Sequence, residues 1–135
     1  KQAFLRPNPR IQEGQLLVEK GVRCAIDISD GLVADLGHIC KASNVGARID
    51  SSRIPVQPAV TSHFGNKALG LAFSGGEDYE LLFTAPLEVI NSVKDAASCP
   101  VTVIGEIIGD NTGDVLVLDD NGRRISLESC GWNHF

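Results

Sequence analysis

The sequence contains no Met and few aromatic residues, which make up 5% of its 135 residues with one Trp and one Tyr. Its apolar runs are short, and none approaches the ~20 residues that a membrane-spanning helix needs. We therefore expect no membrane partner. Because Met is absent and Lys1 stands first, we also expect this chain to be part of a longer protein on which its function depends.

Basic charge is scarce as well. The chain has 12 Lys and Arg against 17 Asp and Glu, a net charge of -5. Scaffolds that bind nucleic acids are usually basic. The composition therefore argues against a nucleic-acid partner.

The cysteines form no CxxC pair and no spacing typical of a disulfide framework: they are Cys24, Cys40, Cys99 and Cys130. An even count permits two disulfides, but buried free thiols fit this spacing better. Free thiols predict a reducing cytoplasm.

Common nucleotide and zinc motifs are missing too. Neither a GxxxxGK[ST] phosphate loop nor a GxGxxG sequence after a strand occurs. The three His residues are scattered and pair with no Cys at zinc spacing. His38 lies off the apolar stripe of a predicted helix, which predicts a surface position.

The apolar pattern predicts a single α/β domain over residues 1–135, with helices packed on a mixed sheet. The 3.6-residue period predicts helices at 10–20, 30–42 and 86–97. Alternation and β-branched runs predict strands at 23–28, 45–49, 71–73, 79–84, 101–108, 115–118 and 124–127. The last two strands would form a hairpin, and residues 55–66 are ambiguous.

The first candidate site is Asp27-Ile28-Ser29-Asp30-Gly31-Leu32, where a strand meets a helix. A helix N-terminus favours phosphate oxygens. Two nearby carboxylates repel each other unless a cation lies between them, and Mg²⁺ prefers such ligands. Gly31 would permit a close backbone approach. Alternatively, Ser29 or Asp30 only caps the helix, and Asp27 is a solvated strand end.

Two further segments carry candidate binding residues. Residues 74–80, SGGEDYE, predict a tight turn after which Glu77 could accept hydrogen bonds from a cationic or amine-bearing substrate; a plain hairpin is the alternative. The tail GWNHF contains Trp132, which could offer a flat surface to a planar ring. A C-terminus docked on the core explains it equally.

Together the segments resemble the thiamine-monophosphate kinase family, within the ATP-binding superfamily of aminoimidazole ribonucleotide synthetase. The matching segments follow the family's order: RPNPR, AIDISDGL, ADLGHI, GARID with IP after it, SGGEDYELLFT, IGEI and GWNHF. The double-aspartate form DISDGL favours the thiamine branch over other members of the superfamily.

This resemblance implies a three-layer α/β sandwich, partly ferredoxin-like. It also implies the C-terminal half of a two-domain kinase, whose N-terminal domain is absent from this chain and forms most of a homodimer interface. The implied activity is ATP-dependent phosphorylation of thiamine monophosphate to thiamine diphosphate, with Mg²⁺. We expect the isolated fragment to be inactive.

The same resemblance implies residue roles. Asp27 and Asp30 match Mg²⁺ ligands, and Ser29 matches a contact to a phosphate of ATP. Glu77, or Asp78 after a register shift, and Trp132 match residues that bind the substrate. No proton-transferring catalytic residue is implied. The alternatives are another ATP-using synthetase or a hydrogenase-maturation enzyme of the superfamily, or a domain that binds nothing alone.

Overall fold

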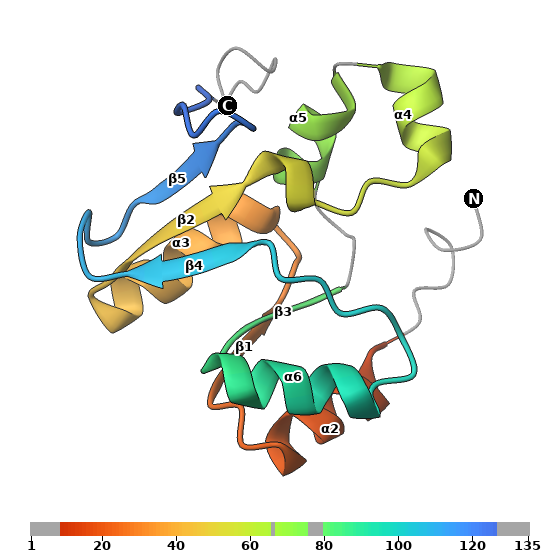
Figure 1. Ribbon diagram of the computed structural model, residues 1–135, viewed down its shortest axis with the longest axis vertical. Coiled ribbons are helices and arrows are strands. Elements are labelled where there is room, and N and C mark those ends of the chain that lie inside the picture. The colour runs from red at the N-terminus through yellow and green to blue at the C-terminus, as the bar shows by residue number, and fades with distance from the viewer. Residues whose placement is uncertain (1–8, 66, 76–79, 127–135) are drawn as a thin grey trace.

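The computed structural model describes residues 9–65, 67–75 and 80–126 (Figure 1). The elements follow in the order α2 (Ile11–Glu19), β1 (Cys24–Asp27), α3 (Leu32–Ser43), β2 (Gly46–Asp50), the 3-10 helix η1 (Ser51–Arg53), α4 (Pro58–Phe64), α5 (Lys67–Ser74), β3 (Leu81–Thr84), α6 (Leu87–Ala96), β4 (Gly105–Ile108) and β5 (Val115–Leu118). The predicted α/β class is confirmed.

The strands in this part of the chain form two sheets. β1 and β3 make an antiparallel pair in which Asp27 lies opposite Leu81. β2 is the centre of the other sheet, where it runs antiparallel to β4 and parallel to β5. This second sheet is mixed, as predicted.

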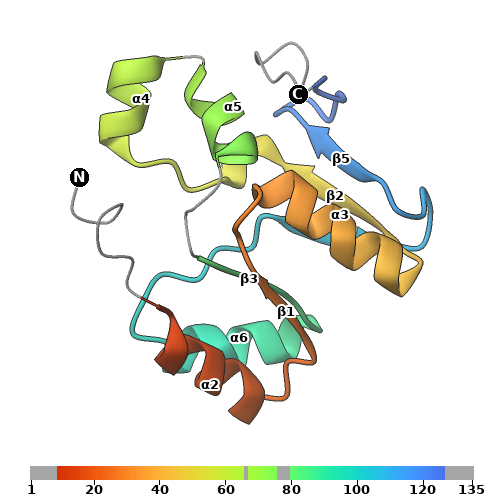
Figure 2. The same cartoon turned by 180° about the vertical axis from the view of Figure 1, so that it is seen from behind.

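Helix α3 supplies the core that covers the mixed sheet. Leu32, Leu36 and Cys40 are spaced at i, i+4 and i+8, so they share one helix face. They cluster with the alternating buried residues Ala47 and Ile49 of β2 and with residues of neighbouring elements. Figure 2 shows α3 lying along one face of this sheet. Because α3 follows the candidate site directly, this core anchors the site.

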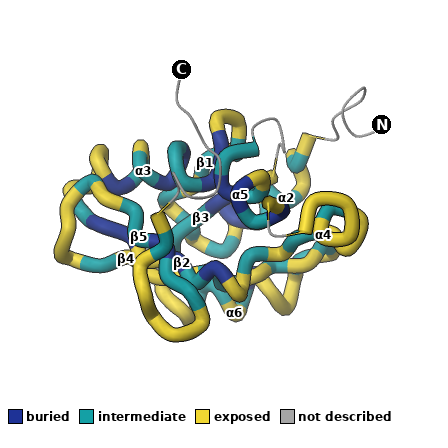
Figure 3. Tube along the Cα trace, turned by 90° about the horizontal axis from the view of Figure 1, so that it is seen from above, coloured by how far each residue is buried: buried dark blue, intermediate teal, exposed yellow. Residues whose placement is uncertain are grey.

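The remaining helices lie around the two sheets. α2 and α6 contact each other and lie side by side next to β1 and β3 (Figures 1 and 2). α4 packs on α5 and is exposed along most of its length, whereas α3 and β2 contain several buried segments (Figure 3). None of the helices in the described segments is long and apolar enough to cross a membrane.

Three strand predictions differ from the structure. Residues 71–73 lie in α5 and not in a strand. The prediction was wrong because the short run Leu-Ala-Phe fits both the helical and the strand period. Only residues 105–108 of the predicted strand 101–108 form one. The predicted strand 124–127 is reduced to a single bridge between Leu118 and Arg124, with residue 127 outside the described residues.

The three predicted helices are confirmed, with ends that differ by one or two residues. The ambiguous stretch 55–66 contains α4.

Cys24, Cys40 and Cys99 are free, as predicted, but only Cys40 of these three is buried. Burial raises the pKa of the Cys40 thiol. Cys130 lies outside the described residues.

Candidate functional site

The junction of β1 and α3 brings three predicted site residues to the surface. Side chains alternate along β1, so that Cys24 and Ile26 are half-buried while Asp27 is exposed. Ser29 and Asp30 follow and are also exposed. Within the described segments, the carboxylates of Asp27 and Asp30 take part in no ion pair or hydrogen bond. Two exposed, uncompensated carboxylates fit a hard divalent cation.

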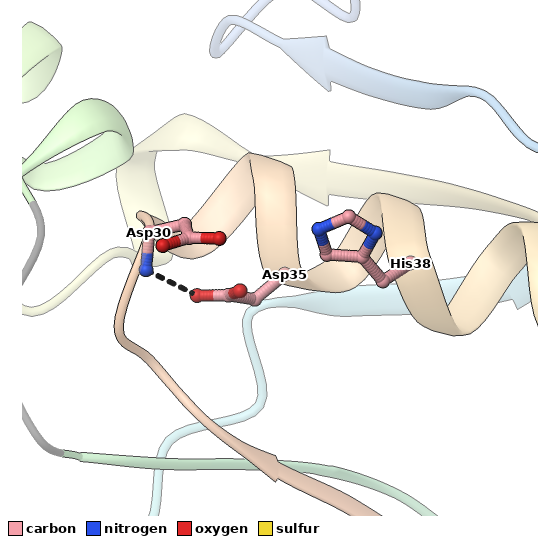
Figure 4. A group of neighbouring side chains, drawn as sticks. All are labelled: Asp30, Asp35 and His38. Carbon is pink, nitrogen blue, oxygen red and sulfur yellow. Dashed lines mark hydrogen bonds between the residues drawn. The ribbon is translucent and has the colours of Figure 1, made fainter.

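A buried carboxylate inside α3 holds the loop that carries these residues. Asp35 is only 2% exposed. Its Oδ2 accepts hydrogen bonds from the backbone N–H groups of Ser29 at 2.9 Å, Asp30 at 3.1 Å and Gly31 at 3.3 Å. Figure 4 shows the bond from Asp30. Because three donors converge on one charged oxygen, the loop is fixed to the helix.

This arrangement corrects the expectation that Ser29 or Asp30 caps the helix. α3 begins at Leu32, its N-cap residue is Gly31, and no side chain makes a cap hydrogen bond. The N–H groups of the preceding loop bond to Asp35 instead. These groups are therefore not free to bind a phosphate, and a contact from Ser29 would use its hydroxyl.

Gly31 has the role that the sequence predicts for it. Its φ of 124° is strained for any residue with a side chain. An added Cβ would lie 3.0 Å from the carbonyl oxygen of Phe73 and 3.2 Å from the Cα of Ser74. The loop thus lies directly against the end of α5.

The first and second sequence motifs therefore meet in space. Besides the contact at Gly31, the N–H of Ile28 donates to the carbonyl oxygen of Glu80 at 2.8 Å. The end of β1 and the residues on either side of positions 76–79 form one surface region. Glu77, Asp78 and Trp132 lie outside the described residues.

An ion pair joins the start of the chain to this region. Arg10 donates from Nη2 to Oε1 of Glu80 at 2.7 Å and from Nε to Oε2 at 3.2 Å. The hydrogen bond and charge of Glu80 raise the pKa of Arg10. Since Glu80 is half exposed, we expect the pair to position the chain more than to stabilise it.

Asp30 also belongs to a group of possible metal ligands that sequence reasoning missed. One donor atom each from Asp30, Asp35 and His38 lies within 4.8 Å of the others. Figure 4 shows the three side chains along the start of α3. His38 is exposed, as predicted. Across residues 9–65, 67–75 and 80–126 this is the one group of three or more such donors, and Asp27 is not in it.

Asp35 was missed because an acidic residue in the first turn of a helix is usually solvated. The available signal was its spacing. Asp35 lies one turn after Gly31 and immediately before the core residue Leu36. This spacing places its carboxylate near the loop N–H groups that precede the helix.

Comparisons with known proteins agree with this architecture. The family model for AIR synthase related protein, C-terminal domain, matches residues 2–118. Thiamine-monophosphate kinase of Escherichia coli K12 is 45% identical over 136 residues, which cover 97% of this chain and 41% of that protein.

Two solved structures are similar to the fold. Thiamine-monophosphate kinase from Stenotrophomonas maltophilia K279a has 38% identity and a TM-score of 0.76, covering 92% of this chain and 39% of the other. AaThiL complexed with AMPPCP and TMP has 34% identity and a TM-score of 0.74, covering 93% and 38%. The chain thus spans only 38–41% of the length of these relatives. By its match to the family model, the chain belongs to the family of AIR synthase related protein C-terminal domains.

Proposed function

We propose that this chain is the C-terminal domain of a two-domain kinase that uses ATP and Mg²⁺ to phosphorylate thiamine monophosphate to thiamine diphosphate. Its similarity to thiamine-monophosphate kinases over nearly its whole length supports this activity. The structural observation that carries the proposal is the exposure of Asp27 at the end of β1 and of Ser29 and Asp30 on the loop held by Asp35. No cationic side chain in the described segments neutralises the two carboxylates.

The remainder of the enzyme would come from a second domain. The relatives are more than twice as long as the part that this chain matches, which leaves room for an N-terminal domain. We propose that this domain completes the nucleotide site and forms a homodimer in the cytoplasm. The relative complexed with AMPPCP, an analogue of ATP, and TMP supports ATP and thiamine monophosphate as the ligands.

Asp27 and Asp30 would hold Mg²⁺ at the β1–α3 junction, with the Ser29 hydroxyl turned toward a phosphate of ATP. Bound Mg²⁺ would neutralise the charge of the phosphates that must approach each other. Glu77 and Trp132 would bind the thiamine group. The acceptor is an ionised phosphate oxygen, so none of these residues needs to remove a proton. Asp35 and Gly31 would keep the loop in place.

An acceptor assay with the full-length protein tests this proposal. Thiamine monophosphate, thiamine and a nucleoside monophosphate are each incubated with ATP and Mg²⁺, and products are separated by chromatography. We expect thiamine diphosphate from thiamine monophosphate alone, and none after chelation of the metal. A folded protein that leaves thiamine monophosphate unchanged, or that phosphorylates all acceptors equally, would contradict the proposal.

A further inference from the structure

We infer that Asp30, Asp35 and His38 form a binding site for a divalent first-row transition-metal ion. The site shares Asp30 with the proposed Mg²⁺ ligands, but it uses two residues to which that proposal gives no metal. It does not depend on the kinase activity.

The positions of the three donors carry this inference. Asp35 and His38 are three residues apart on α3, so their side chains lie on the same face. Asp30 approaches from the preceding loop (Figure 4). Their donor atoms lie within 4.8 Å of one another, yet within the described segments the imidazole makes no ion pair or hydrogen bond with either carboxylate.

The separations of these donors are compatible with one shared metal ion. Two ligands bonded at about 2.1–2.3 Å on opposite sides of an ion lie roughly 4.2–4.6 Å apart. The donor atoms are within 4.8 Å of one another. Asp30 and His38 are both exposed, so their side chains can rotate to adjust the ligand angles.

Asp35 is the fixed member of the set. It is 2% exposed, and its Oδ2 accepts all three of its hydrogen bonds. Its other oxygen, Oδ1, has no hydrogen-bond partner in the described part of the chain, and no Lys or Arg there pairs with the carboxylate. None of the fully buried side-chain N and O atoms in the described segments lacks a partner, so Oδ1 is open to solvent and an ion can reach it. The hydrogen bonds to Oδ2 fix the orientation of the whole carboxylate.

The chemistry of the donors selects the class of ion. Mg²⁺ prefers a shell of oxygen atoms and water. An imidazole nitrogen beside two carboxylates suits ions of the Mn²⁺ to Zn²⁺ series better. We therefore assign the site to a first-row transition ion and choose Mn²⁺ as its probe.

Pulsed electron paramagnetic resonance of Mn²⁺ bound to the full-length protein tests the assignment. Mn²⁺ is added without Mg²⁺, because the proposed site shares Asp30 with the Mg²⁺ ligands. Mn²⁺ bound only to oxygen shows no coupling to ¹⁴N, so this coupling reports a bound imidazole. We expect this coupling in the unmodified protein, and we expect His38→Gln to abolish it and to weaken Mn²⁺ binding by about tenfold or more. His63→Gln, a change at an exposed His of α4, is the matched control and should retain the coupling.

The assignment is overturned if the unmodified protein shows no ¹⁴N coupling, or if the coupling persists in His38→Gln. Because His38 is exposed, its replacement should leave the fold intact, which circular dichroism checks. His38→Ala provides a second variant. The acceptor assay separates the two proposals: an active kinase without nitrogen coupling refutes only this inference, and an inactive protein with the coupling refutes only the kinase.

Discussion

Asp35 holds the loop at the candidate site in place. Its buried carboxylate gathers three backbone N–H groups that would otherwise precede α3 without a partner. Asp27 and Asp30 face solvent and bond to nothing through their side chains in the described segments. Asp35 therefore holds the loop in place, while the exposed carboxylates of Asp27 and Asp30 remain free to bind.

Asp35→Ala should destabilise the protein by about 2–4 kcal/mol, because three N–H groups lose a charged acceptor. Asp35→Asn keeps one acceptor oxygen and should cost less, about 1–2 kcal/mol. Urea unfolding measures both free energies. Asp95→Asn, which changes an exposed carboxylate of α6, is the control and should stay within ~0.5 kcal/mol. An Asp35→Ala protein as stable as this control would show that the three bonds contribute little.

Asp27→Asn and Asp30→Asn in the full-length enzyme should each lower kcat by roughly 100-fold or more, because a neutral amide is a poor ligand for Mg²⁺. Neither carboxylate has a protein partner in the described segments, so the unfolding midpoint should barely change. Steady-state kinetics and thermal unfolding test the two halves of this prediction. Unchanged kcat in both variants would refute their metal role.

The sequence predicts the exposed residues of the site better than the buried one. Alternation along β1 places Asp27 on the side opposite Cys24 and Ile26, and Asp27 is exposed in the structure. Asp35 could not be identified in the same way, since its burial depends on contacts between a helix and the loop before it. Such contacts leave no periodic pattern.

At the scale of elements, Gly31 fixes how the loop packs on α5. Gly31→Ala should destabilise the protein by about 2–3 kcal/mol, because φ is 124° and the new Cβ would meet the backbone of Phe73 and Ser74. Gly37→Ala is the matched control, since a Cβ in the interior of α3 meets nothing within 4 Å. It should stabilise the protein by about 0.5–1 kcal/mol.

Chemical unfolding measures the free energy of unfolding of both glycine variants. We expect it to fall in Gly31→Ala and to rise in Gly37→Ala. If Gly31→Ala proved as stable as Gly37→Ala, the close approach of the loop to α5 would be wrong. A loss of kinase activity in Gly31→Ala alone, with stability retained, would instead mean that the loop shifts without unfolding.

The sequence predicts α2, α3 and α6 more readily than the helix α5. α3 has a stripe of three apolar residues over three turns, so its period is unambiguous. α5 has only eight residues and lies between glycines, and its apolar run fits either period. Its helical state depends on burying Ala68 and Phe73 against the rest of the protein, which a local pattern does not reveal.

At the scale of the whole molecule, the site lies where segments distant in sequence converge. Arg10, the end of β1, the end of α5 and Glu80 meet around one loop. The resemblance of several short segments to one family predicts that these segments belong to one site. The resemblance does not predict which residues of the segments touch, because those contacts depend on the tertiary fold.

The isolated 135-residue chain should show no kinase turnover and only weak heat of binding with ATP and Mg²⁺, because it spans 38–41% of its relatives and holds only part of the proposed site. Calorimetry and the acceptor assay measure this. The full-length protein is the control. Robust turnover by the chain alone would mean that no second domain is needed for catalysis.

The three hydrogen bonds from the loop to Asp35 also affect how fast a ligand can bind. These bonds order the backbone from Ser29 to Gly31 without any ligand. If the proposed site binds an ion or a nucleotide, this segment needs no further ordering on binding. Capture should then be governed by diffusion and by the release of water from the ion. Without these hydrogen bonds the loop would have to become ordered during binding, which would lower the association rate constant of the ligand.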